Sequence, residues 1–180
     1  TQEQIKSLRA GGKILAGVLN DVAALCKEGV NTAELDLACE HAIRAHGAAP
    51  AFLGYQPDGA AYPYPAALCT SINDEVVHGI PSEKRVLRRG DIVSIDTGLN
   101  YQGYFVDAAR TLVVGTAGDT KANQLISARR EALRAAIAVV RPGKHIGDIG
   151  AAIMRVASNR KFLIVEDLGG HAVGRSVHEQ

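Results

Sequence analysis

At 180 residues, of which 47% are hydrophobic, the chain is long enough for one domain with a real core. The formal net charge is +1 and the charges are interspersed, so no basic run or ladder of basic and aromatic residues indicates a nucleic-acid partner. No apolar stretch reaches membrane-spanning length and no secretory signal opens the chain, so no membrane association is expected. The cysteines Cys26, Cys39 and Cys69 are odd in number and lack metal-knuckle spacing, which argues against disulfides and predicts a cytoplasmic protein.

Two helices are predicted at the start of the chain. Thr1 can cap the first, which carries apolar residues at helical spacing to about Glu28 and is stopped by Gly29. Thr32 is expected to cap the second, which ends at Gly47.

A loop rich in Pro and Gly follows, from Phe52 to Pro65. It carries Tyr55, Tyr62 and Tyr64, which can line a pocket for an apolar side chain or merely pin a surface loop. A strand is then expected from Leu68. His78 lies between a β-branched pair and a glycine, where backbone and substrate can approach closely, although a lone histidine in such a place is more often structural.

The most informative stretch is a predicted hairpin between residues 91 and 114. Residues 92–99 (IVSIDTGL) and 104–113 (YFVDAARTLV) are typical of β-strands, and the loop between them has turn formers at both ends. A hairpin closed at this loop pairs Leu99 with Tyr104. Asp96 then faces Asp107 directly, with both carboxylates on one face of the sheet. A register shifted by one residue, as a bulge would produce, instead places them on opposite faces.

Two opposed carboxylates are costly when nothing else is present. They start about 5 Å apart at Cβ, where two unit charges repel by about 3 kcal/mol at an effective dielectric of 20. The pair can share a proton, or a divalent cation between the two groups can remove the repulsion. The histidines further along the chain favour the metal.

The rest of the chain predicts two more helices and a short strand. Asp119 or Thr120 caps a third helix that ends at Pro142-Gly143, a fourth spans about Gly147 to Arg160, and residues 162–165 (FLIV) are expected to form a strand. The buried side of the third helix is expected to carry Leu125, Ile126, Leu133, Ile137 and Val140.

An internal repeat is indicated when Gly29 is set on Gly143. Both segments join a long helix to a second helix through a glycine-containing turn and then run into an extended stretch. We therefore expect two copies of a helix-helix-sheet unit, residues 1–115 and an incomplete 116–180. The hairpin of the second copy would begin beyond Gln180, and its ligands would complete a two-metal site.

Two histidines near the end of the chain add to the candidate ligands. His171 follows two glycines, which let backbone and substrate come close, and His178 lies seven residues later. Imidazole together with carboxylates is a plausible ligand set for a first-row metal ion.

At this point a family resemblance becomes specific. Residues 71–81 (SINDEVVHGIP) resemble the signature of bacterial-type (type I) methionine aminopeptidases. Further motifs of that family match in the same order, namely Asp96-Thr97-Gly98, Asp107 with Ala109-Arg110-Thr111, and residues 170–175 (GHAVGR) with His178-Glu179. The resemblance implies the pita-bread fold, a pseudo-twofold α/β (α+β) domain in which helices flank an antiparallel sheet. Residues 1–180 would form a single such domain without its C-terminal part.

The resemblance also implies roles for individual residues. Asp96, Asp107 and His171 would be metal ligands. His78 would contact the substrate amide during proton transfer, and His178 would help to polarise the scissile carbonyl.

The same resemblance places Tyr55, Tyr64 and Cys69, with Phe52, around the methionine side chain. Cys69 would then be a soft pocket wall rather than a nucleophile. Residues 57–62 resemble a small insertion relative to the family.

The sequence also departs from the family pattern. Ala172 stands where the family usually has glycine, and Val177 where an aromatic residue is common, so that pocket wall is expected to be wider. The two glutamate ligands of the family, one of them the expected general base, should lie after Gln180. Glu166 and Glu179 are not at matching positions.

Three functions compete. The first is a metallo-aminopeptidase that removes the N-terminal methionine of nascent proteins with metal-activated water. The second is a proline-specific aminopeptidase or creatinase-like hydrolase on the same fold, which the motifs around Asp96 and Asp107 would suit but residues 71–81 would not. The third is a truncated, non-catalytic binding module.

The cofactors implied by the resemblance are divalent metal ions, two per site in the complete domain, and Co, Mn, Fe or Zn would suit the ligands. The expected partner is the N-terminal peptide of a nascent protein, with transient ribosome association as a further expectation. A monomer is expected.

Overall fold

The computed structural model describes residues 1–115 and 120–179. The chain divides into two compact units, one made of Thr1–Thr116 with His171–Gln180 and the other of Ala117–Gly170. The predicted boundary between two half-repeats stays a prediction.

Two helices open the first unit, α1 (Gln2–Leu25) and α2 (Thr32–Ala45). Thr1 caps α1 as predicted, since its hydroxyl accepts a hydrogen bond from the Gln4 amide. The cap of α2 is Asn31 rather than Thr32, because the Asn31 side chain accepts from the amide of Glu34 at 3.0 Å. The Thr32 hydroxyl instead pairs with the backbone of Ser82, so the prediction was wrong by one residue.

The sheet is antiparallel and consists of β1 (Ala49–Pro50), β2 (Cys69–Ile72), β3 (Ile92–Tyr101) and β4 (Tyr104–Val113). The strand β4 pairs along the whole length of β3. On the other edge of β3, β2 pairs with its first half and β1 pairs near its end. The strand β3 is therefore the centre of the sheet.

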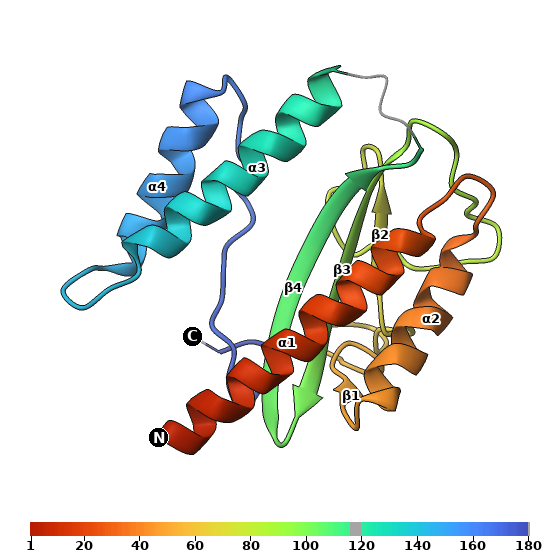
Figure 1. Ribbon diagram of the computed structural model, residues 1–180, viewed down its shortest axis with the longest axis horizontal. Helices are drawn as coiled ribbons and strands as arrows, with labels where there is room; N and C mark the ends of the chain where they lie inside the picture. Colours follow the sequence, from red (N-terminus) through yellow and green to blue (C-terminus); the bar gives the residue numbers. More distant parts are fainter. Residues whose placement is uncertain (116–119, 180) are drawn as a thin grey trace. The chain divides into compact units, whose positions relative to one another are not determined.

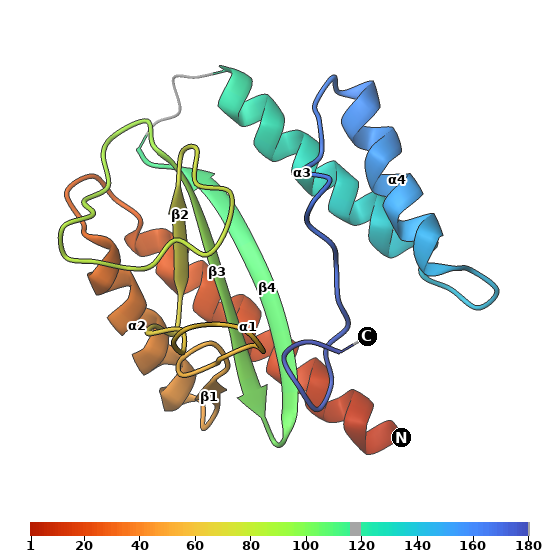
Figure 2. The same ribbon diagram turned by 180° about the vertical axis from the view of Figure 1, so that it is seen from behind.

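The alternation of side chains along β3 separates a core face from a site face. Val93, Ile95 and Leu99 are fully buried and pack against α1 and α2, which cover one face of the sheet (Figures 1 and 2). The side chains of Ser94 and Asp96 therefore leave the opposite face. The core consists of Leu15, Val18, Leu19, Val22, Cys26, Leu35, Cys39, Ile43, Ala48, Leu68, Leu87, Val93, Ile95, Leu99 and Val114.

The second unit contains α3 (Thr120–Val139) and α4 (Ile146–Asn159). Arg160 beyond α4 forms an ion pair with Glu131 of α3, with Nε 2.9 Å from Oε2. The start of α4 is stabilised by Asp148, whose carboxylate accepts from the His145 amide. The predicted cap Asp119 lies outside the described residues.

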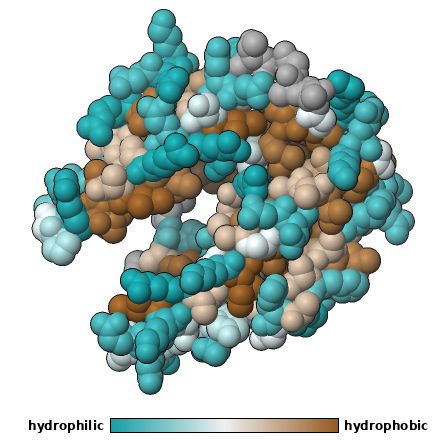
Figure 3. Space-filling view, in the orientation of Figure 1, coloured by the Kyte–Doolittle hydropathy of each residue, from teal (hydrophilic) through white to brown (hydrophobic). Residues whose placement is uncertain are grey.

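Two predictions for this unit were wrong. Residues 162–165 form no strand, and Leu163 is 97% exposed, so no neighbouring backbone completes a ladder there. Of the five apolar residues expected on the buried side of α3, only Ile126 is buried. The other four are exposed, and Figure 3 shows that apolar (brown) and polar (teal) side chains both reach the surface of the molecule.

No helix within residues 1–115 and 120–179 is both long and apolar enough to cross a membrane.

Candidate metal centre and substrate pocket

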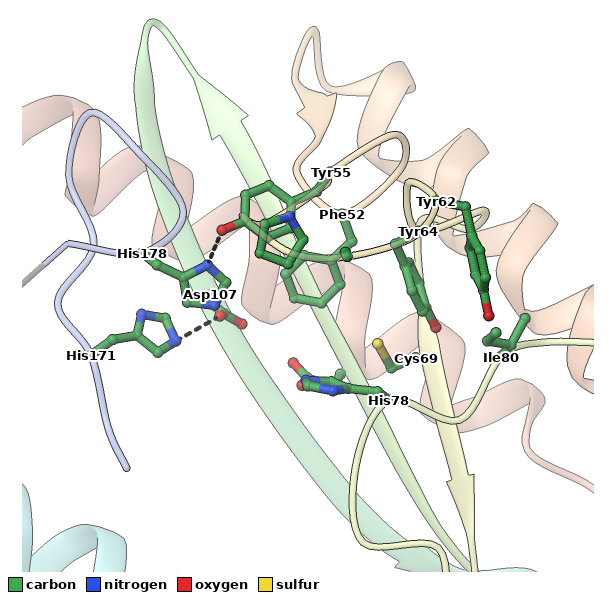
Figure 4. A pocket seen from close by; sticks show the side chains of 13 residues that line it. Phe52, Tyr55, Tyr62, Tyr64, Cys69, His78, Ile80, Asp107, His171 and His178 are labelled. Atoms are coloured by element: carbon green, nitrogen blue, oxygen red, sulfur yellow. Dashed lines mark hydrogen bonds and ion pairs between the residues drawn. The ribbon is translucent and has the colours of Figure 1, made fainter. Parts of the chain in front are cut away.

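A cavity of about 680 Å³ opens within the first unit, on the site face of the sheet (Figure 4). The nine residues predicted as metal ligands, catalytic groups or methionine contacts all line it: Phe52, Tyr55, Tyr64, Cys69, His78, Asp96, Asp107, His171 and His178. Ala172 and Val177, which were expected at a pocket wall, are not among the lining residues. Pro57, Ala60, Tyr62 and Ile80 complete the lining. The structure thus brings together all nine predicted residues, although their individual roles stay predictions.

The two aspartates lie on the same face of the hairpin, but they are not directly opposed. Asp96 pairs with Ala109 and Asp107 pairs with Gly98, so the register differs by two residues from the predicted one. The reason is the turn, which contains only Gln102 and Gly103, both with positive φ (54° and 82°). Because the shift is an even number of residues, both side chains stay on the predicted face, in diagonal rather than direct contact.

A glycine opposite Asp107 keeps this face open. A Cβ at Gly98 would lie 3.1 Å from Cε1 of Phe52 and 3.1 Å from the carbonyl oxygen of Val106. The Phe52 ring therefore uses the space that a side chain at position 98 would take.

The carboxyl groups of Asp96 and Asp107 interact with each other, and the pKa of each is raised. Burial raises the pKa of Asp96 to about 7, with a further contribution from the neighbouring Asp107. Burial also raises the pKa of Asp107, against the opposing effects of Asp96 and of nearby histidines. Two partly buried acids side by side disfavour the doubly ionised state, so the pair holds a proton more tightly than a free carboxyl group does.

His171 faces this pair. Its Nε2 lies 3.6 Å from Oδ2 of Asp107 (Figure 4). Its Nδ1 lies 3.0 Å from the carbonyl oxygen of Ala172. Because a carbonyl oxygen only accepts, Nδ1 carries a proton. In the neutral ring, Nε2 therefore presents a lone pair towards a carboxylate, an arrangement that a cation between them would stabilise.

His178 lies beside His171, with ring centroids 4.3 Å apart, and its Nδ1 is 2.8 Å from the hydroxyl of Tyr55. Desolvation lowers the pKa of His178, and the charges of His171 and His78 lower it further. The charge of Asp107 has the opposite effect and raises this pKa. The lowered pKa favours the neutral form of the ring.

The segment 171–179, which carries both histidines, is hydrogen-bonded to the sheet and also between its own two ends. The amide of Phe105 in β4 donates to the carbonyl of Gly174 at 2.8 Å, and Ala172 and Glu179 form a two-way backbone bridge. The Glu179 carboxylate also accepts from the amides of Arg175 and Ser176.

The apolar side of the cavity is formed by aromatic and sulfur-containing side chains. The Tyr64 hydroxyl lies 3.1 Å from the carbonyl oxygen of Leu68 and 3.2 Å from that of Gly79, so it can donate to either. Burial raises the pKa of Cys69 to about 12, which keeps the thiol protonated. This state supports the prediction of a pocket wall rather than a nucleophile.

The donors on the polar side suit a first-row divalent ion, since they are carboxylate oxygens and an imidazole nitrogen. The partly buried acid pair and the lone pair of His171 both fit a cation. Within the part of the chain that the structure describes, however, no three His, Cys, Asp or Glu side chains are grouped to hold a metal ion. The ligand roles of Asp96, Asp107 and His171 therefore remain predictions.

Three lining residues were missed from the sequence, namely Pro57, Ala60 and Ile80. Pro57 and Ala60 belong to the stretch that resembles an insertion, and Ile80 lies two residues after His78. The only signal that could have identified them was this proximity to predicted site residues, because small or apolar side chains show no chemistry of their own.

Comparisons with known proteins agree on one family. The pattern of metallopeptidase family M24 matches residues 6–180. A methionine aminopeptidase of Aquifex aeolicus is 45% identical over the whole chain, which spans 69% of that protein. Methionine aminopeptidase B of Synechocystis is 40% identical over 98% of the chain, which spans 64% of that protein.

Solved structures give the same result. The chain matches methionine aminopeptidases from Thermotoga maritima (TM-score 0.93, 34% identity) and Rickettsia prowazekii (TM-score 0.93, 37% identity), with all of this chain covered and 70% and 69% of theirs. The predicted pita-bread fold is thereby confirmed. An X-Pro aminopeptidase from Thermotoga maritima (TM-score 0.77, 19% identity, 100% of this chain and 48% of that one) shares the fold alone.

Proposed function

Because the chain belongs to metallopeptidase family M24 and, within it, to the methionine aminopeptidases, we propose that the complete protein removes the N-terminal methionine of nascent proteins. The observation that carries the proposal is a single cavity in which carboxylates and imidazoles line one side and apolar rings the other (Figure 4). The family is one of metal-dependent hydrolases, so divalent ions belong to the activity.

We assign Asp96, Asp107 and His171 as the residues of this chain that hold the metal. When bound, the ions supply the acidity that activates a water molecule and polarises the scissile carbonyl. The chain itself contributes two acceptor groups held rigidly on adjacent strands and an imidazole whose other nitrogen is fixed by the Ala172 carbonyl.

His178 would donate a hydrogen bond to the carbonyl oxygen of the scissile bond. A Tyr55 hydroxyl that donates to Nδ1 would place the proton of the neutral ring on Nε2, the nitrogen left for the substrate. Tyr55 would thus select the tautomer as well as contribute to the cavity wall. His78 would contact the substrate amide and take part in moving a proton to the leaving amine.

The methionine side chain would occupy the apolar side between Phe52, Tyr64 and Cys69. Full burial of a methionine side chain stabilises a complex by about 2 kcal/mol, and thioether sulfur packs well against aromatic rings. Tyr62 and Ile80 extend this side of the cavity, and of the two only Ile80 was not among the candidates from the sequence.

The proposal extends to features of the whole protein. Two divalent ions would share the site in the complete domain, drawn from Co, Mn, Fe and Zn. The protein would act as a cytoplasmic monomer on the N-terminal peptides of nascent chains, with transient ribosome association.

The test uses the complete protein, stripped of metal and reconstituted separately with Mn, Fe(II), Co and Zn. We expect release of methionine from Met-Gly and Met-Ala peptides, and little release from Leu-Gly or Xaa-Pro peptides. Asp107→Asn should lower kcat/KM by roughly a hundredfold or more, as the loss of one charge-stabilising group does in other enzymes. Asp74→Asn, at an exposed position outside the cavity, is the matched control. Failure to release methionine with all four metals, or a preference for Xaa-Pro peptides, would overturn the proposal.

A further inference from the structure

The loop that carries His78 has an unusual backbone. It leaves β2 after Ile72, and both Asn73 and His78 have positive φ, at 57° and 59°. This left-handed conformation is uncommon for non-glycine residues, although Asn and His adopt it more readily than most, and surrounding contacts help to hold it. The side chain of His78 is exposed, so the enforcing contacts lie elsewhere in the loop.

Gly79, which lies directly against β2, helps to hold the backbone conformation of His78. The amide of Thr70 donates to the Gly79 carbonyl at 2.8 Å, and the Gly79 amide donates to the Ser71 hydroxyl at 3.2 Å. A Cβ at Gly79 would lie 2.2 Å from the carbonyl oxygen of Thr70. The residue next to His78 is therefore held at closer range than any side chain would permit.

Arg85 lies outside the motif of residues 71–81, and its guanidinium forms hydrogen bonds with β2 and with the loop that carries His78. Its Nη2 donates to the Thr70 carbonyl at 3.0 Å and also to the Glu75 carboxylate. Its Nη1 donates to the Ile80 carbonyl at 2.5 Å. One planar group thus joins the strand before the loop to residues on both sides of His78.

Arg85 and Glu75 are themselves held in place by hydrogen bonds to the backbone. The Arg85 carbonyl accepts from the Thr32 amide at the start of α2, at 2.9 Å. The Glu75 carboxylate also accepts from the Ile72 amide, at 2.9 Å. Because the guanidinium fork makes several directed bonds at once, a lysine ammonium cannot reproduce them.

We propose that Arg85 is a positioning residue for His78, which sets where the imidazole meets the substrate without contacting the substrate itself. The proposal rests on the proposed function for its effect on turnover. Its structural part, that the Arg85 fork fixes the place of the His78 ring, stands independently of any activity.

The structural part is tested by NMR on the complete protein with labelled histidines. In Arg85→Lys, we expect the ring resonances of His78 to shift and broaden and the amides of Thr70 and Gly79 to exchange at least tenfold faster. Lys84→Met is the control, since it removes a positive charge from the adjacent exposed position. Unchanged His78 resonances in Arg85→Lys would overturn the proposal, whether or not the protein hydrolyses peptides.

The functional part is tested by a double-mutant cycle on a Met-Gly peptide. Arg85→Lys should lower kcat roughly ten- to hundredfold and leave KM within about threefold, as misplacement of a reacting group does. In a His78→Ala background, the same substitution should change kcat by less than about threefold. An equal loss in both backgrounds would show a general structural role and refute the assignment.

A folding defect would not remove the test. If Arg85→Lys does not fold, Glu75→Gln weakens the same fork from its acidic end, and the same pattern is expected at smaller amplitude. An absence of any hydrolysis would contradict the proposed function, and the NMR result would still decide the place of the ring.

Discussion

Asp96→Asn should make the metal-free protein progressively more stable, relative to the wild type, as the pH rises. In the folded chain the pKa of Asp96 is raised from 3.8 to about 7, chiefly by burial. The unfolded chain loses this proton near pH 4 and the folded chain holds it to about pH 7. The group therefore stabilises the fold fully below about pH 4, and this contribution is lost as the pH rises through 7.

The shift sets the size of the effect. Three pKa units correspond to roughly 4 kcal/mol, which is an upper limit because Asp107 and the surrounding structure adjust to the new charge. Asparagine imitates the protonated carboxyl and does not titrate. The difference in free energy of unfolding between the variant and the wild type should thus grow by about 1–4 kcal/mol between pH 4 and 7 and then level off.

The measurement is urea unfolding of the chelator-treated complete protein at pH 4, 5, 6, 7 and 8. The exposed Asp74→Asn serves as the control and should show no comparable trend. Added Mn should reverse the ranking at pH 8, because it binds the folded wild type more tightly than the variant. A difference for Asp96→Asn that does not change with pH would refute the reasoning from the raised pKa of Asp96.

Three further outcomes follow from single contacts. Tyr55→Phe removes the hydroxyl beside Nδ1 of His178 and should lower kcat roughly fivefold to tenfold, the equivalent of one hydrogen bond, with KM nearly unchanged in steady-state assays. Gly98→Ala introduces a methyl group 3.1 Å from the Phe52 ring and should lower the free energy of unfolding by about 1–3 kcal/mol; a urea midpoint equal to that of the wild type would contradict the crowding. The thiol of Cys69, with a pKa of about 12, should react with a disulfide reagent at pH 8 far more slowly in the folded than in the urea-unfolded protein, and rapid reaction of the native thiol would show that it is not buried.

Local signals in the sequence predicted the elements of the first unit well. The capping residue Thr1 and the helical spacing that follows it depend on neighbours a few residues apart, and α1 begins where expected. The cap of α2 was displaced from Thr32 to Asn31 because the Thr32 hydroxyl binds Ser82, which is 50 residues away. Such a partner is set by the tertiary fold and leaves no mark on the local sequence.

The register of the hairpin was predicted wrongly, but this error did not change the face on which the two aspartates lie. Its strands and the shared face of Asp96 and Asp107 were predicted correctly, but the turn closes at Gln102 and Gly103, and the pairing shifts by two residues. Periodicity of two fixes the face of a strand and not its register. The strand predicted at 162–165 failed for a different reason, because apolar β-branched residues form a strand only where a partner strand is available.

The site was predictable to the extent that its side chains carry chemistry. Motif order and resemblance identified nine residues, and all of them line one cavity. Pro57, Ala60 and Ile80 were missed, because only the folded loop reveals which apolar groups reach a cavity. The role of Arg85 was also invisible, because its partners are mostly backbone carbonyls.

The hydrogen bond between Tyr55 and His178 joins residues 123 positions apart. During synthesis the chain emerges from the ribosome with its N-terminus first. The hairpin with both aspartates and the residues of the apolar pocket therefore leave the exit tunnel well before the segment that carries His171 and His178. The carboxyl pair can fold early, and the imidazoles arrive only when that segment docks on β4 through the hydrogen bond between Phe105 and Gly174. Any premature stop before residue 171 therefore leaves an acid pair and a pocket without the histidines that face them.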